Sequence, residues 1–119
     1  MGDRIKLTGI EVLARHGAYI EEKFSDQPFV IDLDCVLDRG TLADRLETTV
    51  DYSELAVVAA DAVRADSVDL IETLADRIAA VCLARYPAIA RITVTVHKPE
   101  APIAVPVRDV AVQVKRRRQ

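Results

Sequence analysis

One segment of the chain limits the possible folds more than any other: residues 28–38, PFVIDLDCVLD, alternate strictly between two kinds of side chain. Apolar side chains occupy every second position from Phe29 to Leu37, and the positions between them hold two valines and two aspartates, with Asp38 following. Successive side chains of a strand point to opposite faces of a sheet. The pattern therefore predicts a β-strand with one buried and one wetter face.

Three further segments show the same alternation. Residues 4–14 begin with apolar side chains at Ile5 and Leu7, and after Gly9 the apolar phase shifts by one residue. A phase shift at a glycine within a strand is typical of a β-bulge or a close backbone approach. Residues 92–96 and 110–114 alternate without interruption, so the chain is expected to form four strands.

Two segments between the second and third strands have apolar residues at helical spacing. The two stripes consist of Leu55, Val58, Ala59, Ala62 and Val63, and of Ile71, Leu74, Ile78, Val81 and Cys82. Asp51 with Glu54, and Asp69 with Glu72, have the spacing of helix start signals, and Pro87 is expected to end the second helix.

The order β-β-α-α-β-β predicts an α+β fold, a four-stranded antiparallel sheet with both helices on one face, in a single domain over residues 1–119. On the uncovered face Val30, Val36 and the valines near residue 105 look too apolar for solvent. The sheet edges also need partners. Both features predict a homo-oligomer.

Composition excludes several classes of function. The net charge is −3, which argues against nucleic acid as a partner, and the basic run Lys115–Arg118 is interpreted as a solvated tail or a cap on the last strand. Cys35 and Cys82 lie in apolar runs and are expected to be free thiols. No membrane-spanning run occurs, which favours a cytoplasmic protein. No metal site is expected, because His16 and His97 are the only histidines.

A few side chains remain that can carry acid–base chemistry. Lys98 ends the third strand, and Pro99 and Pro102 stiffen the backbone after it, although a solvated lysine fits the same position. Glu72 could bind the N–H edge of a heterocycle, but from spacing alone a capping box with Asp69 is favoured. Tyr52, where the first helix begins, could pack or donate a proton, and Glu22 could be a solvated loop charge.

Four segments together resemble the 7,8-dihydroneopterin aldolases of folate biosynthesis: RHGAYIEEKFSDQPFVID, TTVDYSEL, DLIETLADRIA and TVHKPEAPI. The resemblance covers nearly the whole chain. It implies the tunnelling fold and a ring-forming homo-tetramer or homo-octamer with active sites between subunits.

The resemblance also implies roles for individual residues. Lys98 matches the catalytic lysine, Tyr52 the catalytic tyrosine, and Glu22 a glutamate that contacts substrate from a neighbouring subunit. Glu72 matches the anchor of the pterin's amino-pyrimidinone edge, beside the backbone of Ile71.

Four more positions complete the comparison with the family. Val50 is expected to line the pocket by backbone contact, and His16 to have a structural role. The chain departs from many relatives at Ala104 and Val105, where they have another proline or glycine, so the shape of that loop stays open.

The implied reaction is a retro-aldol cleavage that gives 6-hydroxymethyl-7,8-dihydropterin and glycolaldehyde. The C=N bond of the reduced pterin can accept the electron pair, so neither a Schiff base nor a metal nor another cofactor is expected. Two alternatives stay open: an epimerase of the same fold acting on dihydroneopterin or its triphosphate, and a pterin-binding oligomer without turnover.

Overall fold

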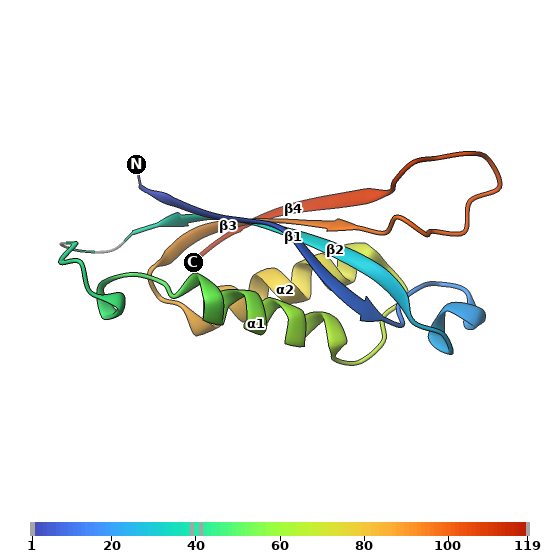
Figure 1. Ribbon diagram of the computed structural model, residues 1–119, viewed down its shortest axis with the longest axis horizontal. Coiled ribbons are helices and arrows are strands. Elements are labelled where there is room, and N and C mark those ends of the chain that lie inside the picture. Colours follow the sequence, from blue (N-terminus) through green and yellow to red (C-terminus); the bar gives the residue numbers. More distant parts are fainter. Residues whose placement is uncertain (1, 39, 41, 119) are drawn as a thin grey trace.

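The computed structural model describes residues 2–38, 40 and 42–118; residues 1, 39, 41 and 119, among them both ends of the predicted domain, lie outside the described residues. Four strands form one antiparallel sheet in the order β1-β2-β3-β4, and two helices lie side by side under one face of it (Figure 1). The elements are β1 (Arg4–Ala14), β2 (Gln27–Leu37), α1 (Tyr52–Arg64), α2 (Ile71–Arg85), β3 (Ile89–His97) and β4 (Ala111–Arg117), with short 3-10 helices η1 (Ile20–Lys23) and η2 (Leu46–Thr48). The predicted element order and fold class are confirmed.

The predicted bulge lies at Gly9. Leu7 pairs with Leu33 and Ile10 with Ile31, so Thr8 and Gly9 together face a single residue of β2. Gly9 has a φ of 78°, a left-handed conformation that glycine adopts without steric cost. The extra residue keeps both apolar halves of β1 on the same face of the sheet.

The core lies between this face and the helices. The five apolar residues predicted for β2 are buried, as are those of β3 (Phe29, Ile31, Leu33, Cys35, Leu37, Ile92, Val94 and Val96). The helical stripes cover them from below, with Leu55, Leu74 and Ile78 fully buried. Val81 was predicted to be in the stripe, but it is 38% exposed.

The two helices begin differently. The Asp51 side chain accepts hydrogen bonds from the Ser53 and Glu54 backbone N–H groups, as predicted for an N-cap. The predicted capping box of Asp69 and Glu72 is wrong: the N-cap of α2 is Leu70, which makes no side-chain capping bond. Asp69 instead pairs with the Lys23 ammonium at 2.7 Å. The first N–H groups of α2 are therefore left without a side-chain cap.

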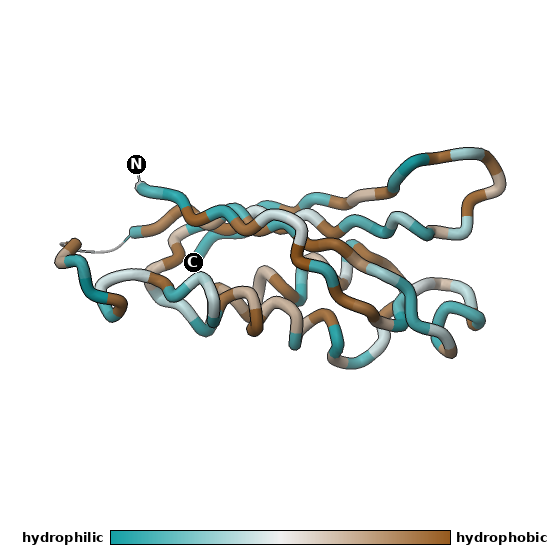
Figure 2. The backbone as a smooth tube through the Cα atoms, in the orientation of Figure 1, coloured by the Kyte–Doolittle hydropathy of each residue, from teal (hydrophilic) through white to brown (hydrophobic). Residues whose placement is uncertain are grey.

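The uncovered face of the sheet is more polar than predicted. Asp34 pairs there with Arg4 at 3.1 Å and Lys6 at 4.0 Å, while Val30 and Val36 are half-buried. Val105 lies in the connection between β3 and β4, away from the sheet. Along the strands, hydrophilic and hydrophobic residues alternate in Figure 2.

The basic run at the C-terminus is the end of β4, as one of its interpretations predicted. Arg116 pairs with Asp76 of α2, and Arg118 donates to the Tyr86 and Ile89 carbonyls. In the described part of the chain, no helix combines the length and apolar character needed to cross a membrane.

Candidate active site

A buried ion pair marks the end of the molecule where β3 stops. Lys98 follows the last residue of β3, and its backbone N–H donates to the Val110 carbonyl at 2.7 Å. Its ammonium lies 2.7 Å from Glu22 Oε2, and both residues are only 9% exposed. A lysine held this way is not the solvated strand-end lysine that its position alone allowed.

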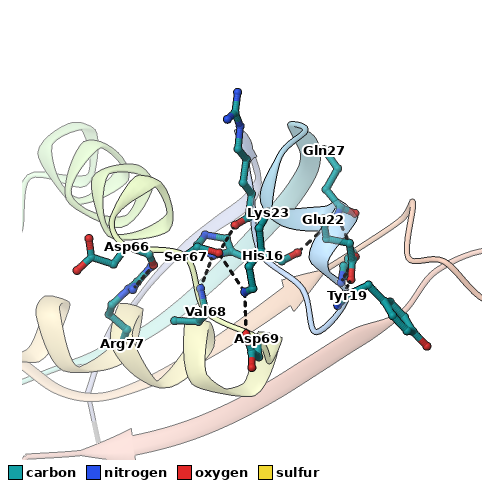
Figure 3. Close-up of polar contacts among 12 residues, drawn as sticks. His16, Tyr19, Glu22, Lys23, Gln27, Asp66, Ser67, Val68, Asp69 and Arg77 are labelled. Carbon is teal, nitrogen blue, oxygen red and sulfur yellow. Dashed lines mark hydrogen bonds and ion pairs between the residues drawn. The ribbon is translucent and has the colours of Figure 1, made fainter.

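Lys98 and two further neighbours, Gln27 and Tyr19, hold the Glu22 carboxylate in place; Figure 3 shows the latter two. Gln27 Nε2 donates to Oε2 at 3.0 Å, and the Tyr19 backbone N–H donates to Oε1 at 3.3 Å. Burial raises the pKa of Glu22, but the hydrogen bonds from Lys98, Gln27 and Tyr19 outweigh it and hold the pKa below its ordinary value. Glu22 is therefore ionised near neutral pH.

Gly17 provides the space for this carboxylate. A Cβ atom at position 17 would lie 2.1 Å from Glu22 Oε1 and 2.2 Å from its Cδ. Any side chain there would displace the carboxylate, so the glycine is needed for close approach rather than for an unusual φ.

His16 is buried below the pair and joins three segments (Figure 3). Its Nδ1 accepts from the Val68 N–H at 3.1 Å, so Nε2 carries the proton and donates to the Val63 carbonyl. Burial lowers the pKa of the ring, which favours this neutral form. These contacts support the structural role expected for His16.

An open pocket of about 240 Å³ brings four of the expected residues together: Glu22, Ile71, Glu72 and Lys98. Pro102 and Ile103 form another part of its wall, whereas Ala104 and Val105 are not among the lining residues. Small-molecule sites measure about 300–1,000 Å³. The pocket of one chain is therefore smaller than a complete site.

Glu72 is the second residue of α2, and its carboxylate makes no hydrogen bond or ion pair within the described ranges. The uncapped N-terminus of α2 is next to it, with backbone N–H groups that can donate to a ligand. Acceptor and donor groups thus lie side by side, as a pterin or purine edge requires.

Tyr52 and Val50 lie elsewhere. Val50 and Asp51 line a different pocket, beside Ala88 and the start of β3. Lys98 follows the other end of this nine-residue strand, about 30 Å away. Tyr52 begins α1 and is 64% exposed.

These positions concern the division of the site between subunits. Glu22 is expected to contact substrate from a neighbouring subunit, and in the structure its carboxylate contacts Lys98 of its own chain. Tyr52 and Val50 are the residues that this chain does not bring to Lys98.

Sequence reasoning missed two supporting residues. Gln27 and Gly17 both belong to the quoted segment RHGAYIEEKFSDQPFVID. Only the folded chain shows that Gln27 donates to the Glu22 carboxylate and that Gly17 leaves room for it. Among the described residues no group of three or more His, Cys, Asp or Glu side chains could hold a metal ion.

Comparison with known proteins gives consistent matches. The family model FolB, dihydroneopterin aldolase, matches residues 5–115. The chain is 40% identical over 118 residues to a dihydroneopterin aldolase of Streptomyces coelicolor, covering 98% of each chain.

Two solved structures resemble the fold. Dihydroneopterin aldolase from Burkholderia thailendensis, bound to guanine, matches with a TM-score of 0.80 and 30% identity, covering 98% of this chain and 92% of that one. E. coli dihydroneopterin aldolase in complex with neopterin matches with a TM-score of 0.86 over 96% of this chain and 98% of that one; its identity of 23% supports the fold only.

Proposed function

The chain belongs to the dihydroneopterin aldolase family, and on this premise we propose that Lys98, Glu22, Tyr52 and Glu72 carry out the retro-aldol cleavage of 7,8-dihydroneopterin in folate biosynthesis. The observation that carries the proposal is the buried Lys98–Glu22 pair, at 2.7 Å, in the same pocket as Glu72. The products are 6-hydroxymethyl-7,8-dihydropterin and glycolaldehyde.

Binding of the pterin ring uses the start of α2. The Glu72 carboxylate accepts from the amino and ring N–H groups of the pyrimidinone, and the Ile71 backbone lies beside it. The lack of a capping bond on α2 supports this role, because its N–H groups and the Glu72 carboxylate remain available to a ligand.

The bond cleavage needs one base and one acid. Lys98, directly or through a water, takes the proton of the 2′-hydroxyl. The C1′–C2′ bond then breaks and releases glycolaldehyde. The electron pair of the broken bond moves into the ring C=N bond. Tyr52 then donates a proton to C1′. Ionised Glu22 stabilises the positive charge that Lys98 carries after taking its proton.

The site is complete only in an oligomer. We propose a homo-tetramer or homo-octamer in which a neighbouring chain supplies Tyr52 and Val50 to the pocket beside Lys98. The small pocket of one chain, the distance along β3 and the free edges of β1 and β4 support this arrangement. The buried free thiols Cys35 and Cys82 support a reducing, cytoplasmic location.

The test is turnover. Purified protein incubated with 7,8-dihydroneopterin is expected to release glycolaldehyde, and Lys98→Ala to lose roughly 10²- to 10⁴-fold in kcat. Lys115→Ala, which changes an exposed lysine of β4, is the matched control and should keep full activity. Full turnover by Lys98→Ala would contradict the catalytic role of Lys98. Release of a C2′ epimer without glycolaldehyde would indicate an epimerase instead.

A further inference from the structure

His97, the last residue of β3, directs both ring nitrogens at carboxylates. Nε2 lies 2.7 Å from Asp32 Oδ2, and Nδ1 lies 2.7 Å from Asp109 Oδ2. A neutral imidazole has one N–H and would turn a lone pair toward one of these oxygens, whereas an imidazolium donates to both. Hydrogen bonds to Asp32 and then Asp109 accordingly raise the pKa of His97.

The imidazolium links the sheet to the connection that precedes β4. Asp32 belongs to β2, and its Oδ1 accepts from the Gly9 N–H of the β1 bulge at 2.8 Å. Asp109 is at the far end of the connection, two residues before β4 begins. His97 thus ties the end of the connection to the part of the sheet stiffened by the bulge.

This connection forms one wall of the pocket through Pro102 and Ile103. Within the described chain, the side chains of residues 99–108 make no hydrogen bond or ion pair, and the backbone bonds near it are Lys98 N–H to Val110 and Ala101 N–H to Lys98. Among the described residues, the Asp109–His97 pair is therefore the polar side-chain contact that ties the end of this wall to the sheet.

We propose that His97 is a positioning residue for the pterin site: by holding Asp109 it keeps Pro102 and Ile103 against the bound ring. The inference rests on the proposed function. Lys98 is secured separately by Glu22, so loss of the His97 tie should weaken substrate binding more than it slows the chemical step.

Charges around His97 decide its response to pH. Asp32 from β2 and Asp109 from the connection contact it, and Glu11 of β1 lies in the same cross-strand row; β4 presents Ala111. The nearest cation in sequence, Lys98, is paired with Glu22. Because its pKa is raised, His97 holds the connection at low pH and releases it as pH rises through that value.

Steady-state kinetics with 7,8-dihydroneopterin test the proposal. In His97→Gln and Asp109→Ala, KM should rise roughly tenfold while kcat changes less than about threefold. The wild-type KM should increase as pH rises from about 6 to about 9, whereas the Asp109→Ala value should be high and nearly constant. Asp34→Asn, which breaks an ion pair on the same face of β2, should behave like wild type. Unchanged KM in either variant that folds would overturn the proposal.

Hydrogen–deuterium exchange separates this inference from the proposed function. Amides of residues 99–109 should exchange several-fold faster in His97→Gln and Asp109→Ala than in wild type or Asp34→Asn. If the wild-type protein does not turn over dihydroneopterin, the proposed function is wrong. The exchange rates of amides 99–109 then test the His97–Asp109 contact by themselves. Equal exchange in all four proteins would then refute the tie.

Discussion

Glycine at position 17 is explained by a side chain five residues away. The Glu22 carboxylate occupies the space where a Cβ would stand, and from there it meets Lys98, Gln27 and the Tyr19 N–H. A residue without a side chain thus determines where the carboxylate proposed to act in catalysis lies. His16 stabilises the same turn through its hydrogen bonds with the Val63 carbonyl and the Val68 N–H.

Gly17→Ala should lower both activity and stability. The added methyl displaces the Glu22 carboxylate and breaks its contact with Lys98, which leaves a buried ammonium without its partner. We expect kcat to fall roughly 10- to 100-fold and the melting temperature to fall as well. Gly40→Ala, where a Cβ meets nothing within 4 Å, is the control for a change from glycine to alanine. Wild-type kcat in Gly17→Ala would argue against a positioned Glu22.

Glu22 also predicts an acid limit to stability. Its pKa is lowered in the folded chain from an ordinary value of about 4.5. Its contribution is therefore present above that value and is lost as pH falls through the lower, folded pKa. In urea unfolding followed from neutral pH to about pH 3, wild type should lose more stability than Glu22→Gln. Parallel curves for the two proteins would contradict this linkage.

At the scale of elements, the two helices begin with different chemistry, because α1 has a side-chain cap and α2 has none. Asp51 caps α1 and so fixes the turn that carries Tyr52. α2 has no side-chain cap, and its N-terminus borders the pocket. Asp69, which has the sequence spacing of a cap, is held by Lys23 from η1.

Two substitutions distinguish the real cap from the apparent one. Asp51→Ala should reduce the free energy of unfolding by about 1 kcal/mol, because it removes two hydrogen bonds to the first turn of α1. Asp69→Ala removes an exposed ion pair and should cost less than about 0.5 kcal/mol. Urea unfolding at one fixed protein concentration measures both. A larger decrease in the free energy of unfolding for Asp69→Ala would support the helix cap that the sequence spacing predicted for Asp69.

At the scale of the whole molecule, the chain is elongated, extending over 51 × 25 × 24 Å (Figure 1). Lys98, Glu22 and Glu72 lie where β3 ends, whereas Val50 lies beside its start. Tyr52, at the start of α1, therefore lies far from Lys98 of the same chain. The proposed association between copies would bring the two residues together.

Mixing inactive variants tests this association directly. Lys98→Ala and Tyr52→Ala chains should each be inactive, but refolded together they should form some sites with both native residues. Random assembly predicts recovery of about a quarter of wild-type activity. Mixtures of either variant with itself are the control. No recovery in mixed oligomers, or a monomer of about 13 kDa on size exclusion, would contradict a shared site.

Local patterns in the sequence determined the strands, their buried faces, the bulge at Gly9 and the helical stripes, because side-chain direction follows backbone periodicity within a few residues. These local patterns did not predict which residues far apart in the sequence contact each other. Asp69 meets Lys23, Glu22 meets Lys98 of the same chain, and Asp34 meets Arg4, each across many residues.

The resemblance predicted the residues of a site, but only the tertiary structure decided which of them one chain brings together. Spacing along a sequence fixes neither the pairing of distant charges nor the end of a strand at which each side chain comes to lie. Those depend on how β3, η1 and α2 pack around one core, and this packing places Tyr52 and Lys98 far apart.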